Sequence, residues 1–105
     1  MDRKSIIKIL KQYTSLLIKE GIEIENAFLY GSYANATYTE DSDIDILIVS
    51  KQFDKENDYL AGKIWALTRK VNTKIEPYII GLNKFLKNET SPLIYSVKKE
   101  GYKII

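Results

Sequence analysis

The chain has 105 residues and a formal net charge of +2 at pH 7, from 16 Lys and Arg against 14 Asp and Glu. At 45% hydrophobic and 29% charged residues, its composition is that of an ordinary globular protein. It contains no Cys and no His, which excludes disulfides, thiolate zinc sites, cysteine nucleophiles and Ser-His-Asp triads. Any catalysis must therefore use carboxylates, hydroxyls, lysines or a bound hard cation.

Length and hydropathy bound the organisation of the chain. This length suits one domain, which we expect to span residues 1–105. Uncharged apolar runs such as residues 46–49 are much too short to cross a bilayer, and no signal peptide fits the N-terminus, so we expect a cytoplasmic protein. The basic residues are scattered and only Arg3 and Arg69 are arginines, so nucleic acid is not an expected partner.

The first predicted element is an amphipathic helix over residues 3–20. Asp2 is placed to cap its first turn, and Gly21 stands where a helix C-cap glycine belongs. Residues 26–30 are predicted to form a short buried strand, followed by a polar loop over residues 31–42 with room for one helical turn. The apolar residues of the helix recur three and four positions apart, the spacing of one buried face: Ile6, Ile9, Leu10, Tyr13, Leu16 and Leu17.

The clearest predicted strand spans residues 43–50, where side chains alternate between two faces. One face carries Asp43, Asp45, Leu47 and Val49, and the other carries Ile44, Ile46 and Ile48. A charged, solvated loop is expected over residues 51–57. It leads into a helix over residues 59–71, which Asp58 is expected to cap and which is expected to bury Leu60, Ile64 and Leu67. Trp65 is expected to lie in the core as well, or to anchor an interface if a partner exists.

The last third of the chain is predicted to add one strand and one helix. Residues 74–80 form the strand, and Pro77 indicates an edge position because proline cannot donate to a sheet ladder. Ser91 as N-cap and Pro92 as first helical residue begin a helix that Gly101 ends, before a short extended segment. The order of elements predicts an α/β (α+β) fold, a small mixed sheet flanked by helices.

Three carboxylates are the candidate catalytic and metal-binding groups. Asp43 and Asp45 project from one face of a strand about 6–7 Å apart, where they repel by about 2 kcal/mol at an effective dielectric near 20. Bound Mg²⁺ relieves such repulsion, and its usual ligands are one or two carboxylates with substrate phosphates. Glu76 joins them if the strand over residues 74–80 pairs with the strand over residues 43–50. Such a site, with two Mg²⁺ ions, suits phosphoryl or nucleotidyl transfer.

Gly31 and Ser32 offer a second kind of ligand-binding group. They stand at a strand end that enters a helical turn, so their backbone N–H groups can cradle phosphate oxygens. A glycine suits this place because the backbone can approach the ligand with no Cβ in the way.

The segment from Gly31-Ser32 to Ser42-Asp43-Ile44-Asp45 and its apolar continuation resembles the signature of the nucleotidyltransferase superfamily related to DNA polymerase β. The small size is similar to the minimal nucleotidyltransferases encoded beside HEPN-domain toxins, and residues 91–102 resemble the end of those proteins. The family often has a glycine where this chain has Ala36, and its third acid is more commonly an aspartate.

The resemblance implies a role for each matching residue. Gly31 and Ser32, with Ser42 next to the acids, are expected to bind the phosphates of a nucleoside triphosphate. The same family places Mg²⁺ on Asp43 and Asp45, with the third acid beside the attacking hydroxyl; here the third acid is Glu76. The implied function is transfer of NMP, AMP from ATP, to a hydroxyl such as a tyrosine of a HEPN-type partner, with this chain as antitoxin.

Three alternatives stay open at the level of sequence. The chain can be a binding module that neutralises a partner by contact alone, or a transferase acting on RNA or a small molecule. The aspartates can be solvated acids at the start of a strand, with Glu76 an exposed glutamate of an edge strand. Tyr33 and Tyr38 lie in the predicted nucleotide loop, where stacking on a base is a further possibility.

Overall fold

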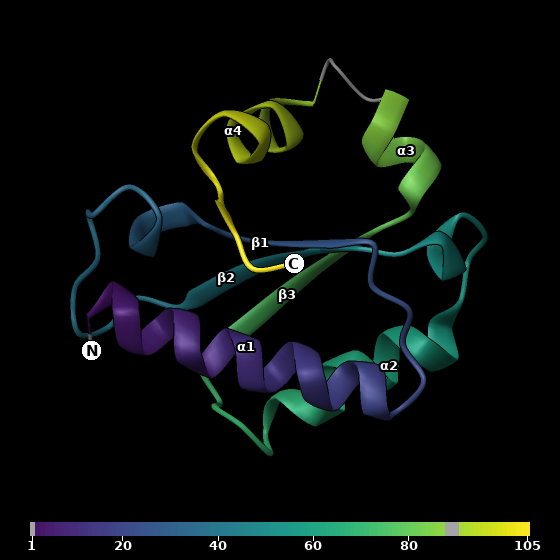
Figure 1. Ribbon diagram of the computed structural model, residues 1–105, viewed down its shortest axis with the longest axis horizontal. Helices are drawn as coiled ribbons and strands as arrows, with labels where there is room; N and C mark the ends of the chain where they lie inside the picture. The colour runs from purple at the N-terminus through teal and green to yellow at the C-terminus, as the bar shows by residue number, and fades with distance from the viewer. Residues whose placement is uncertain (1, 88–90) are drawn as a thin grey trace.

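The computed structural model describes residues 2–87 and 91–105, in which a four-stranded sheet lies between two layers of helices (Figure 1). The expectation of a small mixed sheet flanked by helices is confirmed. The elements in chain order are α1 (Arg3–Lys19), β1 (Asn26–Tyr30), the 3₁₀ turn η1 (Gly31–Tyr33), β2 (Ile44–Val49), the 3₁₀ turn η2 (Lys51–Phe53), α2 (Asp58–Thr68), β3 (Ile75–Ile80), α3 (Leu82–Lys87), α4 (Pro92–Glu100) and β4 (Tyr102–Lys103).

The strand order in the sheet is β3-β2-β1-β4, with β2 parallel to β3 and antiparallel to β1. The edge position of β3 confirms the prediction from Pro77. The amides of Ile44 and Ser50 donate to the carbonyls of Lys74 and Ile80, at 2.9 and 3.0 Å. The backbone N–H and C=O groups of the even-numbered residues of β3 therefore point toward β2. The backbone nitrogen of Pro77, which carries no hydrogen, points to the open edge of the sheet, where no hydrogen-bond partner is needed.

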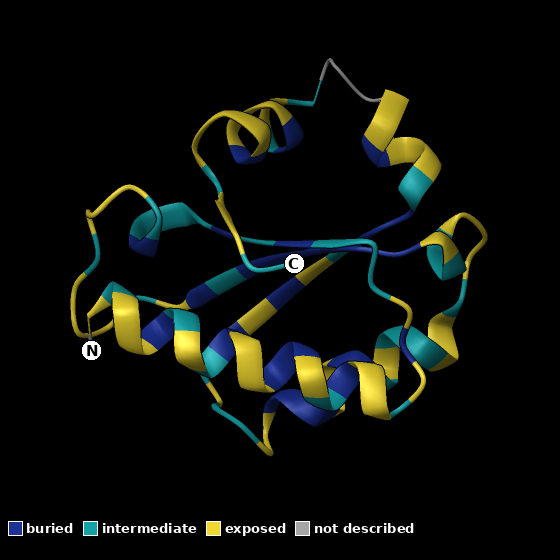
Figure 2. Cartoon of the chain, in the orientation of Figure 1, coloured by how far each residue is buried: buried dark blue, intermediate teal, exposed yellow. Residues whose placement is uncertain are grey.

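The two faces of β2 carry separate apolar clusters, as the alternation predicts. Ile44, Ile46 and Ile48 are fully buried in the cluster that includes α1 and α2 residues. Leu47 and Val49 are fully buried on the other face, where they pack with Phe85, Ile94 and Val97 of α3 and α4. Figure 2 shows buried residues along the sheet and on the inward sides of the helices. Any functional group on β2 must therefore lie where this helical cover ends.

Two of the three predicted helix caps are confirmed. The Asp2 carboxylate accepts from the Ser5 amide at 2.9 Å, and the Ser91 hydroxyl accepts from the Ile94 amide at 3.3 Å. The prediction that Asp58 caps α2 is wrong by one residue. The Asn57 side chain accepts from the Leu60 amide at 3.1 Å, and Asp58 begins the helix. Both residue types are good caps, so the sequence does not separate them.

Two expectations for the second half of the chain are wrong, and one helix was not predicted. Trp65 is 48% exposed and lies outside the core, although Ile64 and Leu67 are buried as expected. Helix α3 was not expected, because six residues are too few to show a helical period. The segment after β2 is not a solvated loop throughout, since it begins with the turn η2.

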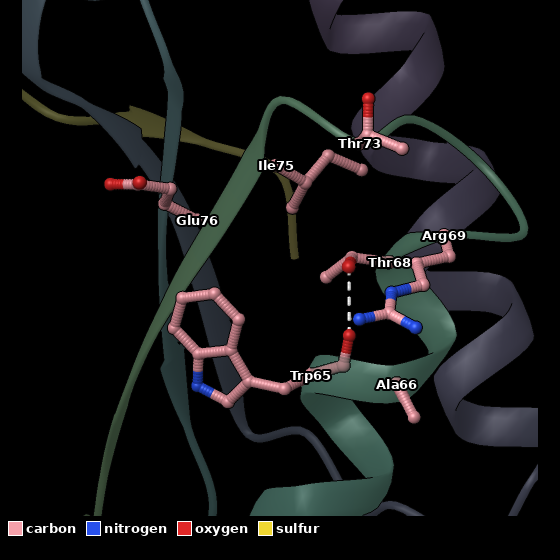
Figure 3. Close-up of a pocket in the computed structure, with 7 residues that line it drawn as sticks. All are labelled: Trp65, Ala66, Thr68, Arg69, Thr73, Ile75 and Glu76. Carbon is pink, nitrogen blue, oxygen red and sulfur yellow. Dashed lines mark hydrogen bonds between the residues drawn. The ribbon is translucent and has the colours of Figure 1, made fainter.

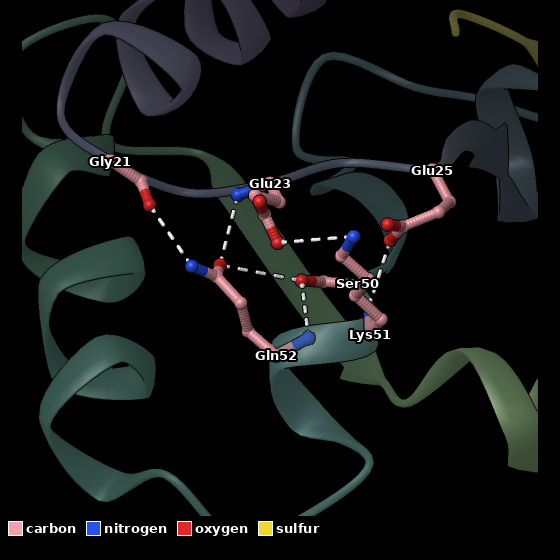
Figure 4. Close-up of polar contacts among 6 residues, drawn as sticks. All are labelled: Gly21, Glu23, Glu25, Ser50, Lys51 and Gln52. Atoms are coloured by element: carbon pink, nitrogen blue, oxygen red, sulfur yellow. Dashed lines mark hydrogen bonds and ion pairs between the residues drawn. The ribbon is translucent and has the colours of Figure 1, made fainter.

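Turn η2 ties the far end of β2 to the connection between α1 and β1 (Figure 4). The Gln52 side chain accepts from the Glu23 amide at 2.9 Å and donates to the Gly21 carbonyl at 3.2 Å. The Lys51 amide donates to the Glu25 carboxylate at 2.8 Å. These bonds fix the C-terminal end of β2, opposite the end that carries the aspartates.

Within residues 2–87 and 91–105, no helix is both long enough and apolar enough to span a bilayer.

Candidate active site

The end of β1 and the starts of β2 and β3 lie side by side at one end of the sheet, and this brings the predicted acids together. In the strand register, Tyr30 at the end of β1 is opposite Asp45 near the start of β2, and Asp45 is opposite Glu76 near the start of β3. Asp43 immediately precedes β2, and the alternation of side chains along a strand predicts that it points to the same face as Asp45. The pairing that the sequence required for Glu76 to join the aspartates is therefore present.

This row of side chains carries uncompensated negative charge. Partial burial, together with the negative charges of Glu76 and Asp43, raises the pKa of Asp45 to about 6. Burial, with the charges of Asp45 and Glu76 nearby, raises the pKa of the Tyr30 phenol to about 12. Neither ion pair found among the described residues involves one of the three acids. The site thus favours a cation.

The turn after β1 lies directly against Asp45. Gly31 has φ +77°, in the left-handed region that favours glycine, and a Cβ at this position would overlap the Asp45 carboxylate oxygen Oδ2. The glycine is therefore required twice, by its backbone conformation and by its contact with an acid of the site. Ser32 follows it inside η1 and is half-buried.

Arg3, at the start of α1, stabilises this turn through hydrogen bonds to its backbone. Its guanidinium donates to the carbonyl oxygens of Tyr33 and Ala34, at 3.0 and 3.1 Å. This role of Arg3 could not be predicted from local sequence patterns, because the two segments lie about 30 residues apart. The only signal was that Arg3 is one of two arginines. With its carbonyls bound on one side, the turn keeps a fixed orientation relative to Asp45.

Tyr33 is a core residue and not a free stacking platform. It is 2% exposed, and its ring stacks on Tyr38 with centroids 4.6 Å apart. The interpretation that Tyr33 stacks on a base is therefore wrong. The tyrosine pair instead packs the loop onto the cluster beneath the sheet.

Ala36 occupies a position whose backbone favours glycine. Its φ is +63°, in the left-handed region that glycine adopts at lower cost than alanine. We expect Ala36→Gly to raise the free energy of unfolding by about 1 kcal/mol, because glycine lacks the Cβ that makes this conformation costly. Urea denaturation measures the change. A variant no more stable than the wild type would contradict the assigned strain, and Ala66→Gly, on an exposed face of α2, is expected to lose stability.

Ser42 shapes the chain immediately before the aspartates. Its hydroxyl accepts from the Thr39 amide at 2.8 Å, and its own amide donates to the Thr39 carbonyl at 3.2 Å. This compact turn sets the direction from which Asp43 enters the site. Binding of a nucleotide by Ser42, as by Gly31 and Ser32, stays a prediction.

The donors present suit Mg²⁺ in part. The described residues include no group of three His, Cys, Asp or Glu side chains placed to hold a metal ion, so coordination by all three acids stays a prediction. Asp43 and Asp45 nevertheless supply two carboxylates, which are hard oxygen ligands, at the start of β2. They lie beside the Gly31 turn, where a Cβ on Gly31 would occupy the space next to the Asp45 carboxylate. Since Mg²⁺ commonly takes one or two carboxylates and completes its shell with substrate phosphates, this donor set fits the ion.

Comparison with solved structures shows that the fold is that of nucleotidyltransferases. A structure from Sulfolobus solfataricus described as a "putative nucleotidyltransferase" has a TM-score of 0.67 at 19% identity, over 96% of this chain and 80% of that one. A structure described as a toxin-antitoxin with AMP-PNP has a TM-score of 0.61 at 18% identity, over 90% of this chain and 72% of that one. At these identities the likeness concerns the fold alone.

Sequence comparison then gives the family. The model of the nucleotidyltransferase domain matches residues 3–101, and the chain belongs to this family. A protein of Methanocaldococcus jannaschii named a "putative protein adenylyltransferase" is 34% identical over 90% of this chain and 92% of its own length. A second protein of that organism, with the same name, is 27% identical over 100% of this chain and 74% of its own length.

Proposed function

We propose that the chain transfers AMP from ATP to a hydroxyl group of a partner protein, a tyrosine of a HEPN-type toxin, and acts as its antitoxin. Membership of the nucleotidyltransferase family supports the reaction class. The adenylyltransferase names of two relatives support a protein acceptor. A fold neighbour described as a toxin-antitoxin supports the paired role, and the sequence resemblance to minimal nucleotidyltransferases supplies the HEPN partner.

One observation carries the proposal: the Gly31 turn lies so close to Asp45 that a Cβ has no room between them. A triphosphate bound at Gly31 and Ser32 then has its reacting phosphate beside the carboxylates, with Ser42 holding the turn that leads to them. In the proposed complex Asp43 and Asp45, with Glu76, hold Mg²⁺. When bound, this ion supplies Lewis-acid stabilisation of the charge on the α-phosphate.

The reaction exchanges one bond to phosphorus for another. The acceptor oxygen forms a bond to the α-phosphorus, and the bond from that phosphorus to the oxygen bridging to the β-phosphate breaks. Pyrophosphate leaves with the bonding electron pair, and the hydroxyl proton passes to the Glu76 carboxylate and from there to water. In phosphoryl transfer most of the rate enhancement comes from positioning and charge, and these are the roles that the proposal gives to the three acids and the Gly31 turn.

The test is incubation with α-labelled ATP and Mg²⁺, with and without the HEPN-type protein encoded beside this chain. We expect label on the partner and a mass gain of one or more AMP units. The double variant Asp43→Ala, Asp45→Ala is expected to transfer none while keeping its fold, because both side chains lie outside the apolar core. Circular dichroism checks the fold, and mass spectrometry of the digested partner identifies the modified residue.

Three results would contradict the proposal in whole or in part. Full transfer by the double variant would show that Asp43 and Asp45 are not needed for the reaction. A stable complex with the partner that forms without nucleotide consumption, and survives the double substitution, would make the chain a binding module that acts by contact. Label recovered on RNA or on a small molecule, with none on the partner, would keep the reaction and change the acceptor.

A further inference from the structure

A pocket of about 470 Å³ lies between the end of α2 and the start of β3, next to the proposed site (Figure 3). Its lining includes Trp65, Arg69, Thr73, Ile75 and Glu76. This volume lies within the range of ordinary ligand pockets. The pocket explains the exposure of Trp65, whose indole forms a wall of the pocket, away from the core.

The chemistry of the pocket suits an aromatic side chain. The Trp65 indole and Ile75 provide apolar surface, and the Arg69 guanidinium extends toward the space between α2 and β3 (Figure 3). Neither ion pair among the described residues involves Arg69, so its charge is available to a ligand ring. Tryptophan and arginine are also among the residue types that are enriched at the anchoring positions of protein interfaces.

The position of the pocket relative to the acids assigns it to one substrate. Across the sheet, the Gly31 turn at the end of β1 lies on one side of Asp45 and Glu76 of β3 lies on the other. In phosphoryl transfer the attacking and leaving oxygens lie roughly in line on opposite sides of the phosphorus. If pyrophosphate leaves toward the Gly31 turn, the attacking hydroxyl enters from the Glu76 side, over the edge of β3.

We propose that this pocket, here called the acceptor pocket, anchors the acceptor protein through an aromatic side chain near the modified hydroxyl. The inference rests on the proposed function, because it assigns the second substrate of the same site. Glu76 joins the two places: it lines the pocket, and its carboxylate points away from Trp65 and Arg69 (Figure 3). An acceptor segment held on one side of the β3 edge therefore presents its hydroxyl on the other.

Trp65 provides a direct readout, because it is the only tryptophan and gives a single indole N–H signal in NMR spectra. N-acetyl-tyrosinamide is the probe, and N-acetyl-leucinamide is the matched non-aromatic control. We expect the aromatic amide to shift the Trp65 indole and Arg69 side-chain signals and to leave the Gly31 amide unmoved. ATP with Mg²⁺ is expected to do the reverse.

A matched pair of variants tests the pocket by substitution. Trp65→Ala is expected to weaken binding of N-acetyl-tyrosinamide, followed at the Arg69 signals, by roughly threefold to tenfold, and to leave ATP affinity unchanged. Tyr59→Ala is the control, since Tyr59 is a 70% exposed aromatic residue on the same helix that does not line the pocket. It is expected to change neither affinity.

The outcomes separate this inference from the proposed function. Shifts of Trp65 and Arg69 by ATP would make the pocket part of the nucleotide site and overturn the inference. An aromatic amide that moves no pocket signal, or that Tyr59→Ala weakens equally, would also overturn it. None of these measurements needs turnover, so they stand whether or not AMP transfer is detected; failure of transfer alone contradicts the proposed function and not the binding of an aromatic group.

Discussion

Asp45→Asn is expected to lower nucleotidyl transfer by at least roughly 100-fold and, at neutral pH, to make the fold more stable. Loss of activity follows because even groups that only support a metal ligand cost roughly 10–100-fold when replaced. Gain of stability follows because Asp45 is half-buried, faces two other acids and is held charged above its pKa of about 6. Amide and carboxylate have nearly the same shape, so the substitution removes the charge and little else.

The stability effect depends on pH with a defined sign. The pKa of Asp45 is about 6 in the folded protein against 3.8 for an unperturbed aspartate, so the folded state binds the proton more tightly. The stabilising contribution of the bound proton is complete below about pH 4 and is lost as the pH rises through about 6. Because solvent screens a partly exposed group, we discount the upper bound of roughly 3 kcal/mol to about 1 kcal/mol.

Urea denaturation at a series of pH values, without divalent cations, measures this effect. We expect Asp45→Asn to be more stable than the wild type by about 1 kcal/mol at pH 7.5, and the difference to vanish near pH 4. Asp41→Asn is the control, since Asp41 is an exposed acid of the preceding loop. A variant that is less stable than the wild type at pH 7.5 would mean that the carboxylate is stabilised by its surroundings.

Gly31→Ala is expected to lower the free energy of unfolding by at least about 2 kcal/mol. The left-handed backbone at φ +77° costs any other residue about 1–2 kcal/mol, and the added Cβ collides with the Asp45 carboxylate. Transfer is expected to be lost as well, since either the turn or the carboxylate must move. Urea denaturation measures stability, and label from ATP measures transfer.

Gly21→Ala separates the two causes. Gly21 has φ +98° with no atom near the position of its missing Cβ, so only the backbone cost applies there. The excess loss at Gly31 over Gly21 measures the collision with Asp45. In an Asp45→Ala background this excess should disappear, because the colliding atoms are gone, and a double-mutant cycle gives the coupling. Equal losses of unfolding free energy in Gly31→Ala and Gly21→Ala would show that a Cβ at position 31 does not collide with the Asp45 carboxylate.

These two substitutions act on one contact in opposite directions. Asp45 destabilises the fold through its charge, and Gly31 is the residue that lets the chain tolerate the acid so close to the turn. Backbone strain and repulsion between like charges are typical of functional sites, where the arrangement needed for activity lowers the stability of the fold. The joint prediction is a site that is more stable without its acid and less stable without its glycine.

Sequence alone determined the elements that depend on local periodicity and local caps. The spacing of Leu10 and Tyr13 gave α1, and strict alternation gave the two buried faces of β2. Pro77 indicated the edge position of β3, because a proline cannot donate a backbone hydrogen bond and so disfavours a strand with neighbours on both sides. The candidate acids were found in the same way, since two aspartates at strand spacing share a face whatever the strand packs against.

Tertiary structure decided what depends on distant neighbours. Alignment of Glu76 with Asp45 needed the parallel pairing of β2 with β3, and Arg3 reaches the Gly31 turn only after the chain has folded back. Trp65 has the spacing of a core residue, yet it lies at the edge of β3, beyond the reach of the core, and there it lines a pocket. Periodicity tells which face of a helix is apolar; only packing decides how wide a stripe of that face the sheet covers.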